Sequence, residues 1–372
     1  MSGGRWIGLT ALLLGGAAFA FIALRTDLLQ SVSREEVQAR LDERLQELEE
    51  ALGVADRDRA AFARIDRAAE SAGAFSERAE EDGALDALYS SFRAAEASDD
   101  AYREFASQPE VLEAVERLLA GDGAGDASGG EPQPGDGLEL RRLDLSQLIG
   151  IAMFAASLDG DALRCAALAR VQFDGAATLL RGSSHSEWIM GHIWMQNGLG
   201  ALGAPIPPDL LEEEESAFQL DRARATGARL ADMLDGAERA RVATAVRRAL
   251  AAFPSNERTV LIGERSSLQM LWPYAEAEGG GARVVRRMLD GMEEVRSEQL
   301  AMAACPTLEE MQRRADELDM RLREAGNSWL SFSTGDPLSY ASLIAPRPPT
   351  VSERLRAEST ALADAFLGAL ER

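Results

Sequence analysis

Residues 145–180 read LSQLIGIAMFAASLDGDALRCAALARVQFDGAATLL, and this stretch indicates the fold class most directly. It contains two apolar segments, 145–158 and 162–180, that are rich in alanine and leucine, which favour helix formation. Neither segment alternates apolar and polar residues as a strand would. Between them, Asp159-Gly160-Asp161 forms a short polar break typical of a tight connection. We therefore predict a pair of antiparallel helices.

The helical pattern continues on both sides of this pair, with breaks at glycine or proline. We expect Gly53 and Gly73 to end two of the helices that precede the pair. Three capping boxes mark helix starts, at Ser33–Glu36, Ser184–Glu187 and Thr307–Glu310. The expected helices outside the pair span residues 34–52, 57–72, 76–96, 109–120, 185–199, 209–234, 237–252, 256–272, 281–304, 308–325 and 351–371.

Because no strand pattern of useful length occurs, the predicted fold class is all-α, without a sheet. Successive helix pairs with short breaks favour an array of antiparallel hairpins, an α-solenoid of the tetratricopeptide-like kind, after an N-terminal transmembrane helix. No strict repeat of about 34 residues is present. The predicted segments are a membrane anchor or signal segment (1–26), an acidic helical bundle or stalk (27–120), a flexible Gly/Asp/Pro linker (121–137), the main helical-hairpin body (138–334), and a Pro-rich connection with the C-terminal helix (335–372).

Residues 6–24 carry no charge and lie between Arg5 and Arg25. A helix of this length spans roughly 28 Å, close to the roughly 30 Å of a bilayer core. We therefore expect a single-pass inner-membrane protein with residues 26–372 exported to the periplasmic side. Cleavage after Ala18-Phe19-Ala20, as in a signal peptide, is the main alternative, and an incorrectly chosen start site is another. Basic residues flank the span on both sides, which leaves the orientation open.

The composition argues against several classes of function. The 372 residues include 39 arginines, no lysine and 62 acidic residues, for a net charge of −23. Such a chain is a poor partner for nucleic acid, and it should repel anionic lipid headgroups. Reactions that need a lysine are excluded, and neither a G-x-S-x-G elbow nor a G-x-G-x-x-G loop after a strand occurs. We assign no catalytic residue, cofactor or metal.

Two groups of polar residues are the candidates for a site. Glu257-Arg258 and Glu264-Arg265 are seven residues apart, so one helix should place them on a common face. We interpret them as an ion-pair latch between neighbouring helices, with a polar ligand pocket or catalysis as alternatives. His192 could join such a pocket as a general base, although a structural role is the first interpretation. His185 is about 10 Å from it along a helix, too far to share a metal ion.

The helix of residues 185–199 should form the buried centre of the body, because it is apolar nearly all round. Trp188 is expected in the core, with a role as an exposed groove anchor as the alternative. Gly191 and Gly198 should let neighbouring helices approach closely. Cys165 and Cys305 are too few for a disulfide scaffold, and we expect them not to pair.

Three stretches carry a resemblance to a known group of proteins. They are residues 141–179, residues 249–265 (ALAAFPSNERTVLIGER), and residues 336–372, with DPL near the start and ALER at the end. Together with the N-terminal span, they resemble uncharacterised membrane-anchored helical proteins of planctomycete-like bacteria, which are similar to tetratricopeptide-type hairpins. The resemblance covers about half of the chain, with degenerate motifs. It implies a helical, exported body and no particular activity.

The sequence therefore favours a membrane-tethered helical scaffold, without catalysis, that presents its hairpin array to a protein or peptide partner. An enzyme with a dispersed Glu/Arg/His site within residues 150–300 is one alternative. A structural subunit of a larger membrane assembly is another.

Overall fold

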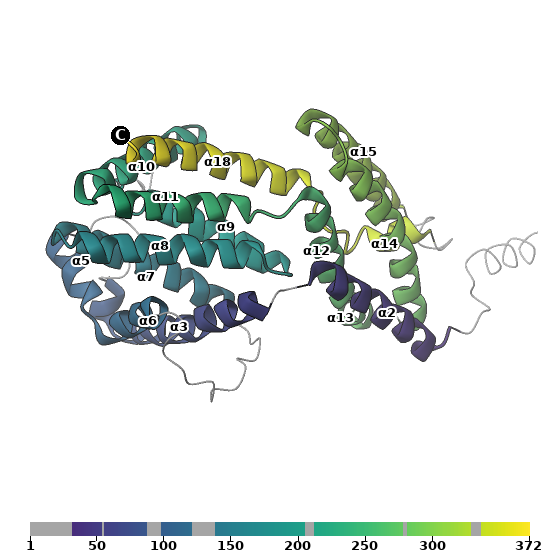
Figure 1. Cartoon of the computed structure of the whole chain (residues 1–372). Coiled ribbons are helices and arrows are strands. Elements are labelled where there is room, and N and C mark those ends of the chain that lie inside the picture. The colour runs from purple at the N-terminus through teal and green to yellow at the C-terminus, as the bar shows by residue number, and fades with distance from the viewer. Residues whose placement is uncertain are drawn as a thin grey trace, which may run out of the picture. The chain divides into compact units, whose positions relative to one another are not determined.

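The computed structural model describes residues 32–53, 56–87, 98–120, 138–204, 212–277, 281–328 and 336–372. Every regular element within these ranges is a helix and none is a strand, which confirms the predicted all-α class for this part of the chain. The chain divides into two compact units (Figure 1). Unit 1 combines the described residues of Met1–Gly53 and Ser255–Glu353, and unit 2 combines those of Val54–Pro254 and Arg354–Arg372.

Unit 2 contains the helical pair from which the fold was predicted. Its two helices, α7 (Leu138–Leu158) and α8 (Ala162–Leu180), are joined by a tight turn in which Gly160 has a φ of 73°, a conformation that favours glycine. Around α8 pack α7, α9 and α11, and α3 packs on α6 and α7. The other helices of this unit are α3 (Asp56–Glu81), α5 (Asp99–Ala106), α6 (Pro109–Leu119), α9 (His185–Gly200), α10 (Glu212–Met233), α11 (Gly236–Ala251) and α18 (Thr350–Leu370), whose first residues belong to unit 1.

Unit 1 combines the first described helix of the chain with helices from residues 255–353. The N-terminal helix α2 (Arg34–Leu52) packs against α12 and α14, and α17 packs against α14 and α15. The apolar face of α2 meets residues such as Leu268 and Met288 in one of the unit's two apolar clusters. The other helices of this unit are α12 (Asn256–Gln269), α13 (Leu271–Ala277), α14 (Ala282–Ala303), α15 (Leu308–Asn327) and α17 (Pro337–Ala341).

The predicted break at Gly73 is wrong, because α3 continues through it to Glu81. This glycine lies close to a neighbouring side chain and does not end the helix. A Cβ at Gly73 would lie 2.6 Å from Cγ of Arg141. Elsewhere one predicted helix, 256–272, is divided at Met270 into α12 and α13.

The three predicted capping boxes have different outcomes. At α9 the box is complete, with reciprocal bonds between Ser184 and Glu187. At α15, Thr307 accepts from the Glu310 amide, but the Glu310 carboxylate pairs with arginines instead. The box at Ser33 is wrong, because its hydroxyl contacts the Glu35 carboxylate and makes no bond to a helix amide.

The boundaries of the two units differ from those of the predicted segments. Residues 34–52, placed in an acidic bundle or stalk with residues up to 120, pack in unit 1 with helices from the second half of the chain. The predicted main body, 138–334, is itself divided at residue 254. The predicted span 6–24 and linker 121–137 lie outside the described residues. Among the described helices, none combines the length and apolarity needed to cross a membrane.

Candidate functional site

The buried carboxylate of Glu264 is the centre of the charge cluster predicted on α12. Only 4% of its side chain is exposed. Arg44 of α2 donates to both oxygens, from Nε to Oε1 at 2.8 Å and from Nη2 to Oε2 at 2.9 Å. Arg296 of α14 places its Nε 3.2 Å from Oε2. Glu264 therefore joins α12 to α2 through a two-pronged arginine pair, the strongest form of such contacts, and to α14 through an ion pair.

Further ion pairs accompany Glu264 along α2. Arg34 pairs with Glu276 at 3.3 Å, and Glu49 pairs with Arg265 at 3.4 Å. Arg40 contacts Asp290 at 2.7 Å and Glu293 at 2.6 Å, and the hydrogen bond with Asp290 is the main cause of its raised pKa. At least one side chain in each of these pairs is 40% exposed or more, so each pair contributes little to stability, whereas the Glu264 carboxylate is enclosed. The interpretation as a latch between helices thus agrees with the contacts of Glu264 and Arg265.

A cavity of about 320 Å³ lies beside this latch, as the alternative of a polar pocket would require. Acidic and basic side chains line it in nearly equal numbers: Arg40, Arg44, Arg296, Glu43, Glu47, Glu264 and Glu293. Most of them are paired with each other. A charged ligand would have to break those pairs, which makes the cavity a poor ligand site.

We expect the substitution Glu264→Gln to release α2 from unit 1. Loss of one partner of a buried pair costs about 3–5 kcal/mol, and we expect about 2 kcal/mol here because Arg44 and Arg296 are partly exposed and regain water. Hydrogen exchange of peptides from residues 34–52 should report a lower opening free energy. Glu293→Gln, at a 65% exposed carboxylate, should change it by less than about 0.5 kcal/mol. Equal exchange in both variants would exclude the latch.

The other predicted site residues of α12 do not join this cluster. Glu257 lies exposed in the first turn of α12, and Arg258 is half-buried there, where burial lowers its pKa. His192 belongs to unit 2, whereas Glu264 and Arg265 belong to unit 1, so the predicted grouping of the three residues stays a prediction. The residues that do complete the cluster, Arg44 and Arg296, were missed.

His192 is enclosed within unit 2, on α9. Its Nδ1 lies 2.9 Å from the hydroxyl of Ser359 on α18, and the two residues are 5% and 0% exposed. Burial lowers the pKa of His192 to about 4, so the ring is neutral at pH 7. A histidine and a serine in hydrogen-bond contact could form a catalytic pair, but a substrate would have to reach them. This burial favours the structural role.

Cysteine and metal chemistry find little support in the described residues. Cys165 is buried in α8, and burial raises its pKa to about 12, so it is not a thiolate nucleophile. Cys165 belongs to unit 2 and Cys305 to unit 1, each is a free thiol among the described residues, and the expectation that they do not pair stays a prediction. Within the described ranges, no group of three or more His, Cys, Asp and Glu side chains is arranged to hold a metal ion.

A groove that the sequence did not predict lies in unit 1, between one face of α15 and residues 342–348. We call this cavity of about 560 Å³ the α15 groove. Asp316, Asp319 and Arg323 follow one another at three- and four-residue spacing along its α15 wall. The opposite wall is the Pro-rich connection, which was predicted only as a linking segment. The apolar lining comes from Ala315, Leu318, Leu322, Ala345, Pro346 and Pro348.

Gln299, one of the residues that line the α15 groove, has an unsatisfied polar atom. Gln299 of α14 is 1% exposed, and its Nε2 donates to the carbonyl of Pro346 at 2.8 Å. Its Oε1 has no hydrogen-bond partner in the described part of the chain. A buried carbonyl left without a donor costs about 1–3 kcal/mol, which a bound N–H or O–H group could recover.

Charges at the rim of the α15 groove are largely balanced. Asp319 pairs with Arg323 at 2.8 Å, and Asp316 accepts from Gln312 at 2.7 Å. Arg347 lies exposed on the opposite wall. The groove therefore has an apolar lining with little net charge around it.

Comparison of the chain with protein-family models, with curated proteins and with solved structures gave no match. The function therefore has to be inferred from the α15 groove and from the attachment of α2. Both features belong to unit 1.

Proposed function

We propose that this chain is a helical scaffold without catalytic activity, tethered to a membrane by residues 6–24, which binds an extended segment of a partner protein in the α15 groove. The observation that carries the proposal is the buried Oε1 of Gln299, which lacks a donor and belongs to a residue that lines the groove. A peptide backbone offers N–H donors at regular spacing, and its side chains can fill the apolar lining.

The attachment of α2 supports the tether. This helix begins at Arg34, shortly after the predicted span ends at Leu24, and the Glu264 latch binds it into the unit that contains the groove. A membrane span at residues 6–24 would thus hold the groove at the membrane surface. The hairpin-array architecture is part of this proposal, and the α7–α8 pair with its Gly160 turn supports it.

The test uses peptides selected from a random display library with the full-length chain in membranes. Asp319→Trp should block the groove, because this exposed residue lines it, and we expect peptide binding to weaken at least about tenfold, or 1.4 kcal/mol. Met320→Trp is the matched control, since Met320 is the next residue, is 56% exposed and does not line the groove. Fluorescence anisotropy of a labelled peptide gives the affinities, and bound peptide should sediment with membranes in high salt.

Three results would contradict the proposal. Equal affinity for the Asp319→Trp variant would show that the peptides bind elsewhere. Equal losses in both variants would indicate a general effect of the added tryptophan. Failure to enrich any peptide above a control protein would favour the alternative of a structural subunit.

A further inference from the structure

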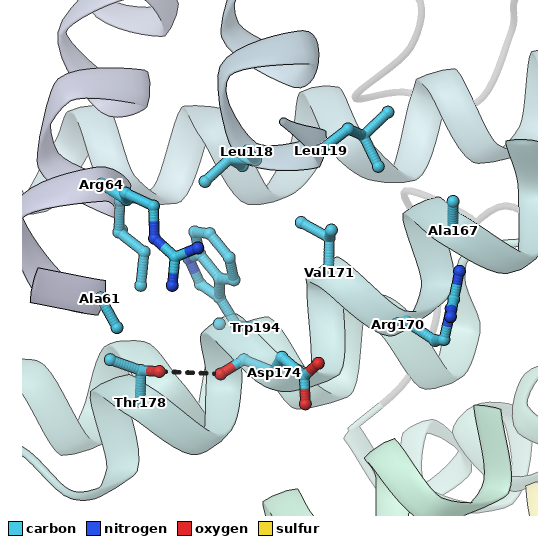
Figure 2. Close-up of a pocket in the computed structure, with 12 residues that line it drawn as sticks. Ala61, Arg64, Leu118, Leu119, Ala167, Arg170, Val171, Asp174, Thr178 and Trp194 are labelled. Atoms are coloured by element: carbon cyan, nitrogen blue, oxygen red, sulfur yellow. Dashed lines mark hydrogen bonds between the residues drawn. The ribbon is translucent and has the colours of Figure 1, made fainter. Parts of the chain in front are cut away.

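Unit 2 has a cavity of about 310 Å³ whose walls come mainly from helices α3, α6 and α8 (Figure 2). Arg64 and Arg170 lie on opposite sides of this cavity (Figure 2). Its acidic residue, Asp174, pairs with Arg248 at 2.6 Å. The polar groups of this cavity therefore do not converge on one ligand. The features that indicate a partner lie in unit 1, beside the α15 groove.

The wall of the α15 groove at residues 344–348 has a sequence that favours an extended backbone. Ala345 and Arg347 each precede a proline, and the ring of the following residue disfavours the helical region for both. The two prolines have a fixed φ of about −65°, which an extended chain tolerates. Pro346 also packs closely on α12, because a Cβ at Gly263 would lie 2.8 Å from the proline Cβ. Residues 345–348 accordingly belong to no helix.

Two carbonyl groups attach this wall to other helices of unit 1. The carbonyl of Ile344 accepts from the Ser267 hydroxyl of α12 at 2.7 Å. The carbonyl of Pro346 accepts from Nε2 of Gln299 on α14 at 2.8 Å. In an extended chain, backbone groups two residues apart lie on the same edge, so both bonded carbonyls belong to one edge of the wall.

The opposite edge of the wall, which we call the free edge, consists of the backbone groups of Ala345 and Arg347. The N–H and C=O groups of these two residues have no hydrogen-bond partner in the described part of the chain. Both residues line the α15 groove. The residues at 346 and 348 are prolines, whose missing N–H groups would belong to the bonded edge. The prolines therefore leave both N–H groups of the free edge intact, as prolines in edge strands do.

Unpaired backbone groups along an extended segment are a template for another extended chain. Main-chain hydrogen bonds then supply affinity, and alternate side chains supply specificity. The two bonded carbonyls hold the free edge in place before binding, which lowers the entropy cost of ordering it. Two copies of this chain could pair by the same edge, but each has a net charge of −23, so they repel one another. The free edge therefore fits a different partner.

We propose that the partner segment adds to the free edge as a β-strand, paired through its main chain with Ala345 and Arg347. This proposal rests on the proposed function and specifies how the α15 groove recognises its partner. In either strand direction, two partner N–H groups that are two residues apart donate to the carbonyls of Ala345 and Arg347, and partner carbonyls accept from their N–H groups. The groove thus recognises an extended main chain.

Methylation of the peptide backbone tests this pairing without a change in the protein. A fluorescein-labelled peptide from the display selection is made as the parent and as a series with one N-methyl group at each position in turn. At two positions, two residues apart, methylation should weaken binding to the full-length chain in membranes at least about tenfold, because each methyl group removes a donor to a carbonyl of the free edge. Methylation of the residue between them should change the affinity by less than about threefold, since its N–H points away from the free edge.

Variants of Arg347 test the same contact from the side of the protein. Arg347→Pro removes one N–H donor of the free edge, so the parent peptide should bind at least about tenfold more weakly. Arg347→Ala is the matched control, because it removes the side chain and keeps the N–H, and it should bind within about threefold of the parent protein. Circular dichroism should give the same helix content for both variants, since this N–H makes no bond in the described part of the chain.

The outcomes separate this proposal from the proposed function. Equal affinity throughout the methylated series, or equal affinity of the two Arg347 variants, would overturn the strand pairing, while a loss of binding in Asp319→Trp would still support the groove. Failure to select any peptide would overturn both proposals. A dimer of the chain alone that dissociates in Arg347→Pro would assign the free edge to a second copy, and this result would also overturn the proposal.

Discussion

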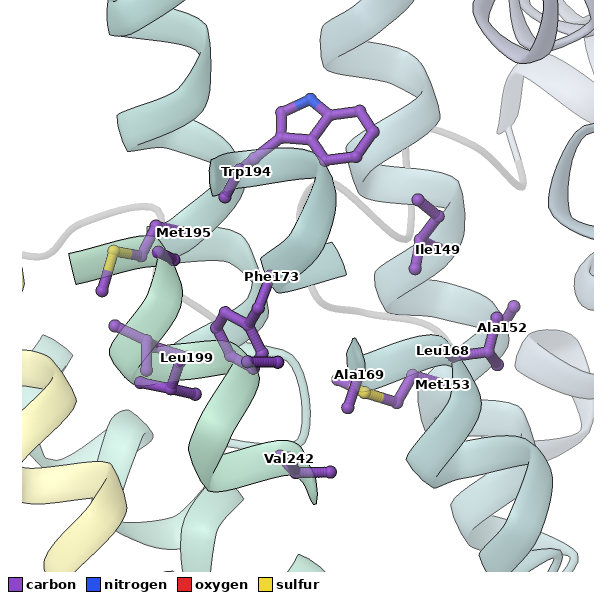
Figure 3. Packing of buried hydrophobic residues seen from close by; sticks show 14 of the residues in the cluster. Ile149, Ala152, Met153, Leu168, Ala169, Phe173, Trp194, Met195, Leu199 and Val242 are labelled. Atoms are coloured by element: carbon purple, nitrogen blue, oxygen red, sulfur yellow. The ribbon is translucent and has the colours of Figure 1, made fainter. Parts of the chain in front are cut away.

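Substitution of Trp188 by alanine should lower the free energy of unfolding of unit 2 by about 3–5 kcal/mol, a large share of a typical total of 5–15 kcal/mol. The side chain is 1% exposed, which confirms the core placement predicted from sequence and excludes the groove anchor. Its Nε1 donates to Nδ1 of His185 at 3.1 Å, so truncation also removes a hydrogen bond. Two other residues of the same helix, Trp194 and Met195, are also buried and belong to the apolar core of unit 2 (Figure 3).

Urea denaturation followed by circular dichroism measures this effect on a chain that starts at Thr26. Gln196→Ala is the matched control on α9, since Gln196 is half-buried and bonds to an exposed carboxylate on α18. It should change stability by less than about 1 kcal/mol. An unchanged midpoint in the Trp188→Ala variant would mean that the indole does not support the core.

The second large effect is a loss of folding stability when the pH is lowered. In the unfolded chain His192 has a pKa of about 6.5, whereas burial lowers it to about 4 in the folded protein. Between these values the unfolded chain binds a proton that the folded protein does not. The stability contributed by neutral His192 is complete above pH 6.5 and is lost as pH falls toward 4, which amounts to about 3 kcal/mol at 1.36 kcal/mol per unit.

Variants of the two histidines isolate the contribution of histidine to the pH dependence of stability, because the chain contains no other histidine. His192→Gln should lose about 3 kcal/mol less than the parent protein between pH 7 and pH 4. His185→Gln measures separately the part of the pH dependence that comes from His185, whose Nδ1 accepts from Nε1 of Trp188. Burial raises the pKa of Asp66 and Glu358, and these carboxylates act in the opposite direction, but they are common to all three proteins and cancel in the comparison. Identical pH profiles for His192→Gln and the parent would refute the assignment.

Local information in the sequence was sufficient for the helices. Most predicted boundaries agree with the structure to within a few residues, since apolar periodicity, capping residues and glycine act over one or two turns. The tight approach at Gly191 is confirmed, because a Cβ there would lie 2.7 Å from the backbone nitrogen of Leu180. Gly73 shows the limit of such reasoning: the same residue type ends one helix and admits a neighbouring arginine in another, and the local sequence does not distinguish the two.

The sequence by itself therefore determined the all-α class and the burial of α9, and it placed Glu264 in a candidate group of charged residues. Tertiary structure alone decided which residues pair with Glu264 and how the chain divides into two compact units. Arg44 lies 220 residues before Glu264, and nothing in the spacing of either residue relates the two. The unsatisfied Gln299 and the α15 groove could not be predicted either, because a groove is formed by elements that lie far apart in the chain. Helix formation depends on near neighbours, whereas ion pairing and cavities depend on long-range packing, which the local pattern does not encode.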